Sequence, residues 1–505
     1  MIENENPLLL FFVFFLIFLY TTSLITIFFY SLAQFDLLDN YLKEKNNLKK
    51  LSQWNFNKKK EFPFVTIQLP IYNELYVIER LLSSIVQIKY PSDKLEIQVL
   101  DDSDDDSIRL TEKLIYEIKN TGVDIVHIKR KNRLGYKAGA LKEGLKTSKG
   151  EFIAIFDSDF LPNSDFLFKT IPYFKNCEIG MVQTRWGHIN RNFSVLTKVQ
   201  AFALDAHFTL EQVGRNFQNH FINFNGTAGI WRKSTILDAG NWEGDTITED
   251  LDLSYRAQLK DWKFIYLEKI VTPAELPIVM SAIRSQQYRW NKGGAENFQK
   301  NIFKVLKSSN IKIKTKIHAF LHLLNSTIFL NIFFVGFLSV PMLYIKNEWN
   351  QLNWFFNFSS LFILSTLIFY ICYWFIHKQK YGAGLYSLCD YTLRFITFYS
   401  ISIAFSVHNS IAVLKGHLGM KSPFIRTPKF NIKKDNSNFL NQNRYIEKSI
   451  GVYAFIEALM SLYFLFGLFS AFNVTKNGDF ILFPFHLVLF LGFGFVFIKS
   501  IIEIK

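Results

Sequence analysis

The feature that most constrains the fold of this chain is an uncharged apolar run near the N-terminus, Leu8–Tyr30. The run is longer than the roughly 20 residues that an α-helix needs to cross the hydrocarbon core of a bilayer. Residues 1–7 carry two glutamates and no basic residue, and no small-residue cleavage site follows, unlike a secretory signal peptide. We therefore predict a retained transmembrane helix within residues 1–35.

Further apolar runs, with basic clusters beside them, fill the C-terminal part of the chain. The runs lie near Ala319–Tyr344, Trp354–Ile376, Tyr391–Leu414, Ile450–Phe472 and Phe480–Ile498. Basic clusters occur at Lys43–Lys60, Lys304–Lys316 and Lys415–Lys434. Such clusters next to apolar runs are typical of cytoplasmic membrane flanks. We therefore interpret the net charge of +14 as contact with a lipid bilayer and predict no nucleic-acid partner.

The basic segment Lys415–Lys448 decides how many times the chain crosses the membrane. If Tyr391–Leu414 spanned the bilayer, this segment would lie on the outer side, against the positive-inside rule. We predict instead that Tyr391–Leu414 lies in the interface or forms a re-entrant element. That interpretation gives four C-terminal spans and five in all, whereas a crossing by Tyr391–Leu414 would give six.

Residues 63–300 have the pattern of one α/β domain. Short β-rich runs lie at Phe64–Leu69, Leu95–Leu100, Glu151–Phe156 and Glu178–Gln183, with helix-compatible stretches such as Glu79–Ile88 and Ser107–Lys119 between them. This alternation predicts βαβ units and a Rossmann-like, mostly parallel sheet. Polar segments follow three of the strands, at Pro70–Glu74, Asp101–Asp106 and Asp157–Asp159. Because ligands bind outside the carboxyl ends of such strands, we expect these segments to form one site.

Two of these polar segments contain candidate ligand-binding carboxylates. Asp157 and Asp159 stand at alternate positions directly after a strand, where they can hold Mg²⁺ or Mn²⁺ and leave coordination positions for a diphosphate. Asp101 and Asp102 can accept hydrogen bonds from a base or from ribose hydroxyls. The remaining acids, Asp104–Asp106, are expected to be solvated residues at the start of the next helix, where the helix dipole favours them.

A third acidic motif, Thr248–Glu249–Asp250, precedes the predicted helix Leu251–Gln258. Asp250 can serve as a general base that removes the proton of an acceptor hydroxyl, with Glu249 beside it as a further candidate catalytic residue. The alternative is that Asp250 only caps the helix, which is a common use of aspartate. The motif by itself favours the cap over the general base.

The stretch Gln286–Trp290 is the most informative for function. In a helix, Gln286, Arg289 and Trp290 stand at positions i, i+3 and i+4 and share one face. That face offers an amide, a guanidinium suited to a pyrophosphate, and a flat indole on which a sugar ring can dock. A surface helix with one buried tryptophan does not account for the combination.

Together these elements resemble the D,D,D,QxxRW set of processive family 2 glycosyltransferases, the group that contains cellulose synthase and plant cellulose-synthase-like mannan and glucan synthases. The resemblance covers Phe64 to about Lys300 closely and the membrane segments in outline. The amino-acid sequences of Gly135–Leu141 and Phe224–Gly229 most resemble those of the plant mannan and xyloglucan-backbone synthases. The resemblance implies an α/β GT-A fold, in a cytosolic domain inserted between transmembrane helices.

The resemblance also implies roles for individual residues. Asp250 would be the catalytic base, and Asp157 and Asp159 would hold the metal. The nucleotide-sugar would contact Tyr72, Glu74, Asp101, Asp102, Lys137, Asp157 and Arg289, and the acceptor would contact Asn225, Gly226, Gln286 and Trp290.

One more match lies outside the catalytic domain, at Phe424–Lys429. It resembles the FxVTxK gating loop of cellulose synthase, which closes over bound nucleotide, so Thr427 and Lys429 are also candidate nucleotide-sugar ligands. Arg426 replaces the usual valine, and Pro428 stiffens the loop. The alternative is a basic linker beside the membrane.

The expected activity is inverting, processive transfer of a hexose to a growing β-linked glucan or mannan, coupled to export. The expected donor is UDP-glucose or GDP-mannose, the cofactor Mg²⁺ or Mn²⁺, and the location the cytoplasmic membrane, with possible accessory export subunits. The main alternative is non-processive transfer to a lipid-linked acceptor. A transporter with an inserted domain would predict ionisable residues within the spans, and few are present. A scaffold without activity is disfavoured because every motif position is intact.

The predicted organisation follows from these interpretations. It comprises an N-terminal transmembrane helix (1–35), a basic cytosolic linker (36–62), the GT-A domain (63–300), a basic interfacial segment (301–316), two transmembrane helices (317–377), an interfacial helix with the gating-like loop (378–448) and two further transmembrane helices (449–505).

Overall fold

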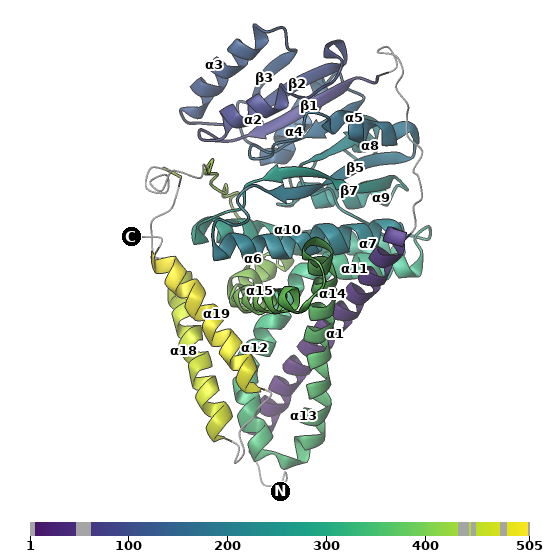
Figure 1. Ribbon diagram of the computed structural model, residues 1–505. Helices are drawn as coiled ribbons and strands as arrows, with labels where there is room; N and C mark the ends of the chain where they lie inside the picture. Colours follow the sequence, from purple (N-terminus) through teal and green to yellow (C-terminus); the bar gives the residue numbers. More distant parts are fainter. Residues whose placement is uncertain (1–5, 47–61, 433–443, 446–450, 475–481, 503–505) are drawn as a thin grey trace.

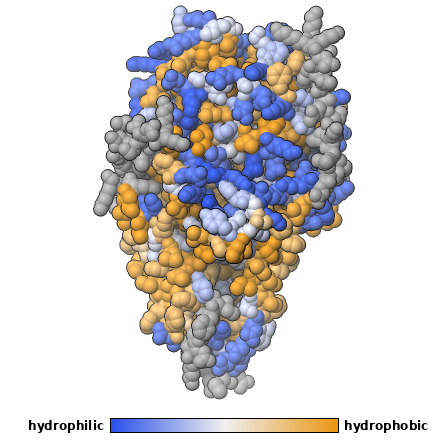
Figure 2. Space-filling model, in the orientation of Figure 1, coloured by the Kyte–Doolittle hydropathy of each residue, from blue (hydrophilic) through white to orange (hydrophobic). Residues whose placement is uncertain are grey.

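The computed structural model describes residues 6–46, 62–432, 444–445, 451–474 and 482–502. A mixed α/β domain forms one end of the molecule, and long apolar helices form the other (Figure 1). The space-filling view shows the same division, because hydrophobic residues dominate the surface of the helical end and hydrophilic residues gather on the α/β domain (Figure 2). Helix α10 (Met280–Lys307) runs across the junction.

A seven-stranded sheet in the order β3-β2-β1-β4-β6-β5-β7 forms the core of the domain. The strands are β1 (Val65–Ile71), β2 (Leu95–Asp101), β3 (Ile125–Lys129), β4 (Phe152–Ile155), β5 (Ile179–His188), β6 (Gly229–Arg232) and β7 (Lys263–Ala274). All neighbouring pairs are parallel except those of β6, which runs antiparallel to β4 and to β5. The mostly parallel sheet is therefore confirmed, with one reversed strand that the sequence pattern did not indicate.

Helices cover both faces of this sheet. They are α2 (Ile78–Ile85), α3 (Ser107–Lys119), α4 (Tyr136–Thr147), α5 (Phe166–Thr170), α6 (Val195–Ala206), α7 (Gln212–Phe217), α8 (Lys233–Asp238) and α9 (Glu249–Gln258), with a π-helical segment, His207–Glu211, between α6 and α7. The apolar face of α2 packs on the sheet through residues such as Leu81 and Ile85, which are fully buried. Burial of this kind supplies about 25 cal/mol per Å² of apolar surface.

The other end of the molecule consists of long helices. They are α1 (Pro7–Asn46), α11 (Ile313–Leu324), α12 (Ile328–Glu348), α13 (Asn353–Ser359), α14 (Ile363–Tyr381), α15 (Leu385–Ala404), α16 (Ser406–His417), α18 (Val452–Asn473) and α19 (Leu482–Ile502). In Figure 1, α18 and α19 form one side and α1 and α14 form the other, while α12 lies between them and α15 lies beneath α10.

Five helical stretches in the described residues are long and apolar enough to cross a membrane. They are Pro7–Lys45, Ile313–Glu348, Asn350–Tyr381, Val452–Asn473 and Leu482–Ile502. A sixth would follow only if α15 and α16, which are bent by 49° relative to each other, counted as one span. The choice between five and six spans therefore rests on the element that the sequence marked as ambiguous.

Two predicted boundaries differ from the structure. Helix α1 continues to Asn46, well into the stretch 36–62 that was predicted as a linker, and residues 47–61 lie outside the described part. The stretch 301–316 is not a separate segment, because α10 and α11 occupy most of it. Helix α1 extends past its last apolar residues because its end packs against α7 and the π-helical segment of the α/β domain, a contact that hydropathy does not reveal.

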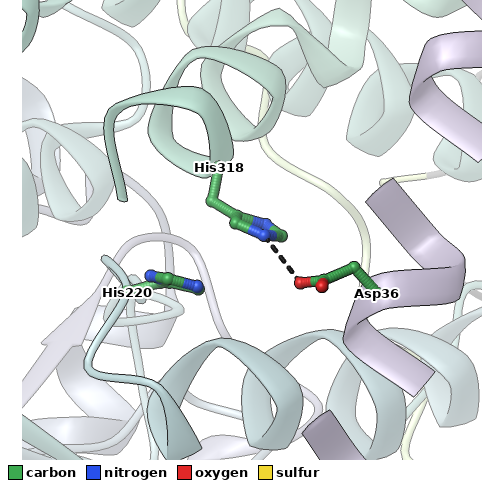
Figure 3. A group of neighbouring side chains, drawn as sticks. All are labelled: Asp36, His220 and His318. Carbon is green, nitrogen blue, oxygen red and sulfur yellow. Dashed lines mark hydrogen bonds and ion pairs between the residues drawn. The ribbon is translucent and has the colours of Figure 1, made fainter. Parts of the chain in front are cut away.

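The C-terminal end of α1 is joined to the α/β domain by a group of three polar side chains (Figure 3). His318 Nε2 lies 3.0 Å from Asp36 Oδ2, and Lys314 Nζ donates to Asp36 Oδ1 over 2.9 Å. His220 stacks on His318, with ring centroids 4.3 Å apart and an angle of 17° between the planes. These contacts tie α1 to α11 and to the loop after α7.

This group does not have the geometry of a metal centre, although its ligand atoms lie within 4.8 Å of one another. A bound ion must lie close to the plane of each imidazole that holds it. The stacked rings of His220 and His318 have nearly parallel planes that do not meet at one ion. Lys314 also places a positive charge on the carboxylate. We therefore interpret the group as a structural joint.

Candidate active site

A deep cavity opens at the carboxyl ends of β1, β2 and β4, where the sequence predicted the site. It encloses about 1330 Å³, counting the space at its open mouth. The strand ends and the start of α9 form its floor, α10 forms one wall, and residues 418–432, which we call the roof loop, lie over it. The roof loop comes from the helical end of the chain, so both halves of the molecule build the site.

The structure brings fifteen of the sixteen candidate residues to this cavity. They are Tyr72, Glu74, Asp102, Lys137, Asp157, Asp159, Asn225, Gly226, Glu249, Asp250, Gln286, Arg289, Trp290, Thr427 and Lys429. Asp101 is the exception. Its buried carboxylate lies 2.9 Å from His127 Nε2 and accepts from the backbone N–H of Ser103, so it has a structural role within the sheet.

The two candidate metal ligands are each paired with a lysine. Lys137 Nζ lies 2.6 Å from Asp157 Oδ1 and also donates to the carbonyl oxygen of Gly226 over 2.9 Å. Lys429 Nζ, from the roof loop, lies 2.7 Å from Asp159 Oδ1. Both lysines thus place positive charge beside hard carboxylate oxygens that follow a buried strand. The donor set is the kind that Mg²⁺ and Mn²⁺ prefer.

Glu249 and Asp250 lie in the first turn of α9, after Thr248, which occupies the N-cap position. Asp250 is therefore not the N-cap residue of α9, although its Oδ1 accepts a hydrogen bond from the N–H of Leu251 over 2.9 Å. Burial, together with the neighbouring negative charges, raises the pKa of both carboxyls. Lys137 opposes this effect on both carboxyls. A raised pKa suits a carboxylate to accept a proton.

Gly226, in the loop between α7 and β6, lies against the side chain of Asp250. Its φ of +80° is in the left-handed region, and a Cβ placed there would lie 3.0 Å from Asp250 Oδ2 and 3.4 Å from Lys137 Nζ. Only glycine fits both restrictions without strain. The neighbouring Asn225 accepts from Gln212 Nε2 over 2.6 Å, so its amide is held at the wall of the cavity.

Helix α10 confirms the predicted shared face, because Gln286, Arg289 and Trp290 all line the cavity. Arg289 donates to Thr427 Oγ1 over 2.7 Å and lies 4.8 Å from the ring centroid of Phe424. Gly293 lets α10 pack closely against the start of α9, since a Cβ there would lie 2.4 Å from Oγ1 of Thr248, the N-cap residue of α9. Arg289 and the start of α9 are thus fixed relative to each other through α10.

The roof loop is held closed by charged side chains. Arg426 donates to both carboxylate oxygens of Glu74, over 3.1 and 2.6 Å. Glu275 accepts from three successive backbone N–H groups, those of residues 430–432. Phe424 stacks on Tyr136, with ring centroids 5.4 Å apart. The loop therefore covers the cavity. Arg426 stands where the resembled family has valine, and its ion pair with Glu74 is one of the contacts that hold the loop in place.

The side chains at the Tyr72 and Asp102 end of the cavity are more tightly paired than the sequence suggested. Arg130 binds both oxygens of Asp102, with its Nε 2.8 Å from Oδ1. The Arg133 guanidinium lies 3.3 Å from the centroid of the Tyr72 ring. Arg130 already occupies both oxygens of the Asp102 carboxylate. The stacked Arg133–Tyr72 pair is therefore a second candidate surface on which a nucleobase could stack.

Several cavity residues were not singled out from the sequence. They are Arg133, Trp186, His188 and Glu275. Trp186 and His188 belong to β5, which runs on to His188 instead of ending near Gln183 as predicted. A rule that looks only at polar residues after strand ends misses them, because both lie within the last part of the strand.

A second acidic cluster, formed by Glu243, Asp245 and Asp252, also has its oxygens within 4.8 Å of one another. Lys300 Nζ lies 2.6 Å from Glu243, 2.7 Å from Asp245 and 3.1 Å from Asp252. None of the three acids lines the cavity. Lys300 comes from the rigid helix α10 and already supplies the positive charge, so this cluster has a structural role.

Comparison with known proteins identifies the domain. Residues 63–293 match the family described as "Glycosyltransferase like family 2". The chain is 44% identical over 262 residues to probable glucomannan 4-beta-mannosyltransferase 11 of Oryza sativa subsp. japonica, a match that covers 51% of this chain and 46% of that protein. It is 43% identical over 262 residues to glucomannan 4-beta-mannosyltransferase 9 of Arabidopsis thaliana, over 51% of this chain and 49% of that protein. The chain thus spans about half the length of the curated relatives it matches.

Among solved structures, the fold is similar to that of the mannosyltransferase PcManGT from Pyrobaculum calidifontis, in complex with GDP-Man and Mn²⁺. The TM-score is 0.51 at 18% sequence identity, and the match covers 78% of this chain and 99% of that one. Similarity at this level of identity concerns the fold alone. Residues 63–293 of this chain therefore form a glycosyltransferase family 2 domain of the GT-A fold, flanked by apolar helices long enough to cross a membrane.

Proposed function

We propose that this protein transfers mannose from GDP-mannose to a growing β-linked polysaccharide, with inversion at the anomeric carbon. The observation that carries the proposal is the convergence of the Asp157–Asp159 pair, Asp250 and the Gln286–Trp290 face on one cavity. The printed names of the relatives, which are 4-beta-mannosyltransferases, favour mannose over glucose. The GDP-Man in the complex with the similar fold points the same way.

Asp250 would act as the general base. In one step the acceptor hydroxyl oxygen forms a bond to the anomeric carbon, and the bond from that carbon to the diphosphate breaks. The electron pair of the broken bond goes to the diphosphate, and the hydroxyl proton goes to Asp250. The raised pKa of this carboxyl, caused by burial and the nearby acids, supports proton acceptance near neutral pH.

Lys137 and Arg289 would offset the charge of the leaving diphosphate. Lys137 reaches Asp157 and the Gly226 carbonyl from α4, and Arg289 reaches the roof loop from α10. Burial works against the charged form of Lys137, yet Asp157 and Glu249 outweigh it and raise the pKa, so the side chain stays cationic. Fixed cations at a site where negative charge develops are among the strongest contributions to catalysis.

Asp157 and Asp159 would hold a divalent ion, Mg²⁺ or Mn²⁺. Their fit to such an ion rests on the two carboxylates after β4 and on the lysine ammonium groups that contact them. When bound, the ion would act as a Lewis acid on the diphosphate. Lys429 would move from Asp159 toward the donor phosphates, which would couple closure of the roof loop to donor binding.

The acceptor sugar would rest on Trp290, with Gln286 and Asn225 beside it. All three line the same cavity, and Asn225 is positioned by Gln212. If Trp290 keeps hold of the end of the product, that end can accept a further sugar, which supports repeated addition. The adjacent apolar helices support placement in a membrane and export of the product. The catalytic domain would then lie on the cytosolic side of the cytoplasmic membrane.

The test is to incubate the purified full-length protein with radiolabelled GDP-mannose or UDP-glucose, each with Mg²⁺ or Mn²⁺. We expect a long labelled product from GDP-mannose that a β-1,4-mannanase degrades and a β-1,4-glucanase does not. A polymer formed only from UDP-glucose would contradict the choice of donor. A single mannose on an extractable lipid would contradict polymer formation and favour transfer to a lipid-linked acceptor.

A further inference from the structure

A second cavity lies next to the active site, between the catalytic domain and the basic end of α14. It encloses about 1380 Å³, counting space open to solvent. Residues of β5, α6 and β7 line it from the domain, and residues of α14 and α15 line it from the apolar helices. Trp186 and His188 line both this cavity and the active site, so the two cavities share a wall.

The lining of this cavity has an excess of positive charge. Its basic side chains are Lys45, Arg185, Arg191, Lys198, Lys380 and Arg394, and its acidic ones are Asp205 and Glu268. Three of the cations share one carboxylate, because Asp205 contacts Arg185 at 2.9 Å, Arg191, and Lys380 at 3.5 Å. Arg185 also lies 3.6 Å from Glu268, and Arg394 is paired with Asp390, so the carboxylate of Asp205 is left to balance Arg191 and Lys380. One carboxylate cannot neutralise both cations, so the cavity attracts an anion beside them.

Hydrogen-bond donors beside this excess charge lack partners. Trp186 Nε1, His188 Nε2 and Thr209 Oγ1 are shielded from solvent and have no hydrogen-bond partner among the described residues. Burial lowers the pKa of His188 to about 3, so its ring is neutral and adds no charge. Unpaired buried donors are costly, and an oxygen-rich ligand would satisfy them. Thr209 also lies in the π-helical segment, a local distortion that often marks functional sites.

The depth of the cavity along α14 indicates a lipid. Helix α14 ends the apolar stretch Asn350–Tyr381, and Lys380 and Tyr381 at its end line the cavity together with Tyr373. Basic and aromatic residues at the end of a span lie at the depth of the lipid headgroups. A neutral β-glycan would explain the aromatic rings but not the excess of cations.

We propose that this cavity binds the phosphate of an anionic membrane lipid, held by Arg191 and Lys380. The lipid phosphate would complete the charge balance around Asp205, and the acyl chains would lie along α14 and α15. Bound there, the lipid would fasten the β5 wall of the active site to the membrane surface. This binding does not depend on which sugar the catalytic site transfers.

The test is native mass spectrometry of the full-length protein released from nanodiscs that contain phosphatidylglycerol and phosphatidylcholine. We expect retention of phosphatidylglycerol over phosphatidylcholine. Since one basic residue contributes about 1 kcal/mol to binding an anionic lipid, Lys380→Gln should weaken retention about five-fold, and Arg191→Gln combined with Lys380→Gln should weaken it further. Lys378→Gln, which removes the same charge from the same helix end but does not line the cavity, is the matched control.

Three outcomes would overturn the proposal. The first is equal retention of the two lipids by the unmodified protein. The second is an equal loss with Lys378→Gln and Lys380→Gln, since general surface charge would then explain the binding. The third is displacement of the lipid by millimolar inorganic phosphate or by a β-mannan oligosaccharide, which would assign the cavity to a free anion or to the glycan product.

Discussion

Two carboxylate clusters in this molecule are built from the same residue types but differ in the lysine that neutralises them. In the first, Lys300 from the middle of α10 contacts Glu243, Asp245 and Asp252 at once. In the second, which lies in the active site, Lys137 from α4 contacts Asp157 and Lys429 from the roof loop contacts Asp159. We call them the helix cluster and the loop cluster.

The difference lies in what each lysine is attached to. Lys300 extends from the packed helix α10 to three acids at once, and the side chain of Asp252 among them is fully buried. Lys429 belongs to a segment without helix or strand, fastened mainly by side-chain contacts such as Arg426 with Glu74. A cation on a loop can be exchanged for a metal ion and a diphosphate, whereas a cation on a packed helix is part of the fold. Chemical similarity between acidic clusters therefore does not imply similar function.

The largest expected effect separates the active-site acids from those of the helix cluster. Asp250→Asn should lower the transfer rate by about 10²–10⁴-fold, because the amide cannot accept the hydroxyl proton. Donor binding, measured by isothermal titration with GDP-mannose, should be retained. Asp245→Asn, in the helix cluster, is the control and should keep nearly the full rate. Near-normal polymer synthesis by Asp250→Asn would remove Asp250 from its assigned role.

Removal of divalent ions should have the next largest effect. We expect EDTA to lower the rate by about 100-fold or more, and Mn²⁺ or Mg²⁺ to restore it, because the ion would balance the charge of the leaving diphosphate. Asp157→Asn and Asp159→Asn should bind Mn²⁺ more weakly in electron paramagnetic resonance titrations, whereas Glu243→Gln should not change Mn²⁺ binding. Loss of Mn²⁺ on changing Glu243 would mean that the helix cluster is the metal site.

The two lysines provide the most direct test of the comparison. Lys300→Met should lower the free energy of unfolding by about 2 kcal/mol, roughly 4–8 °C in melting temperature, because it leaves clustered acids unpaired. Lys429→Met should leave the melting temperature nearly unchanged but raise the KM for the donor about ten-fold, the effect of losing about 1.4 kcal/mol of binding. The comparison would be wrong if both variants lost the same stability.

The smallest expected effect concerns pH. Because the pKa of Asp250 is raised by burial and nearby acids, the fraction of unprotonated base falls as pH decreases, and kcat/KM should decline well above the ordinary aspartate pKa of about 3.9. The pKa of Glu249 is raised further, to about 7, so this carboxyl is largely neutral while Asp250 titrates. Glu249→Gln should therefore leave the decline nearly in place. A shift of the decline to lower pH by about one unit or more would show that Glu249 carries charge in that range.

Much of the site could be predicted because its chemistry follows strand ends. Asp157 and Asp159 come directly after a buried strand. Gln286, Arg289 and Trp290 have the spacing of one helix face. These two local patterns were enough to predict that the residues line a binding site, and all five line the cavity. The Asp101–Asp102 pair shows the limit of such reasoning. Successive side chains of a strand point to opposite faces, and nothing local tells which of two aspartates faces the ligand.

The parts that could not be predicted depend on residues that are distant in the chain. Strand β6 inserts antiparallel between β4 and β5, and that pairing is not visible in its four residues. The closed roof loop depends on Arg426 reaching Glu74 across about 350 positions of sequence, and on Glu275 accepting from the loop backbone. Hydropathy likewise did not separate a bent α15–α16 pair from a span.

The periodicity of apolar residues, the hydropathy and the spacing of motifs were thus sufficient to predict the fold class, the apolar helices and most of the residues that line the site. These properties are local, because each depends on neighbours within a few turns or one strand. The pairing of each charge was decided only when the chain folded, and with it the distinction between the helix cluster and the loop cluster. The physical reason is that the energy of a buried carboxylate depends on which cation packing brings within a few ångströms, and sequence order does not encode that distance.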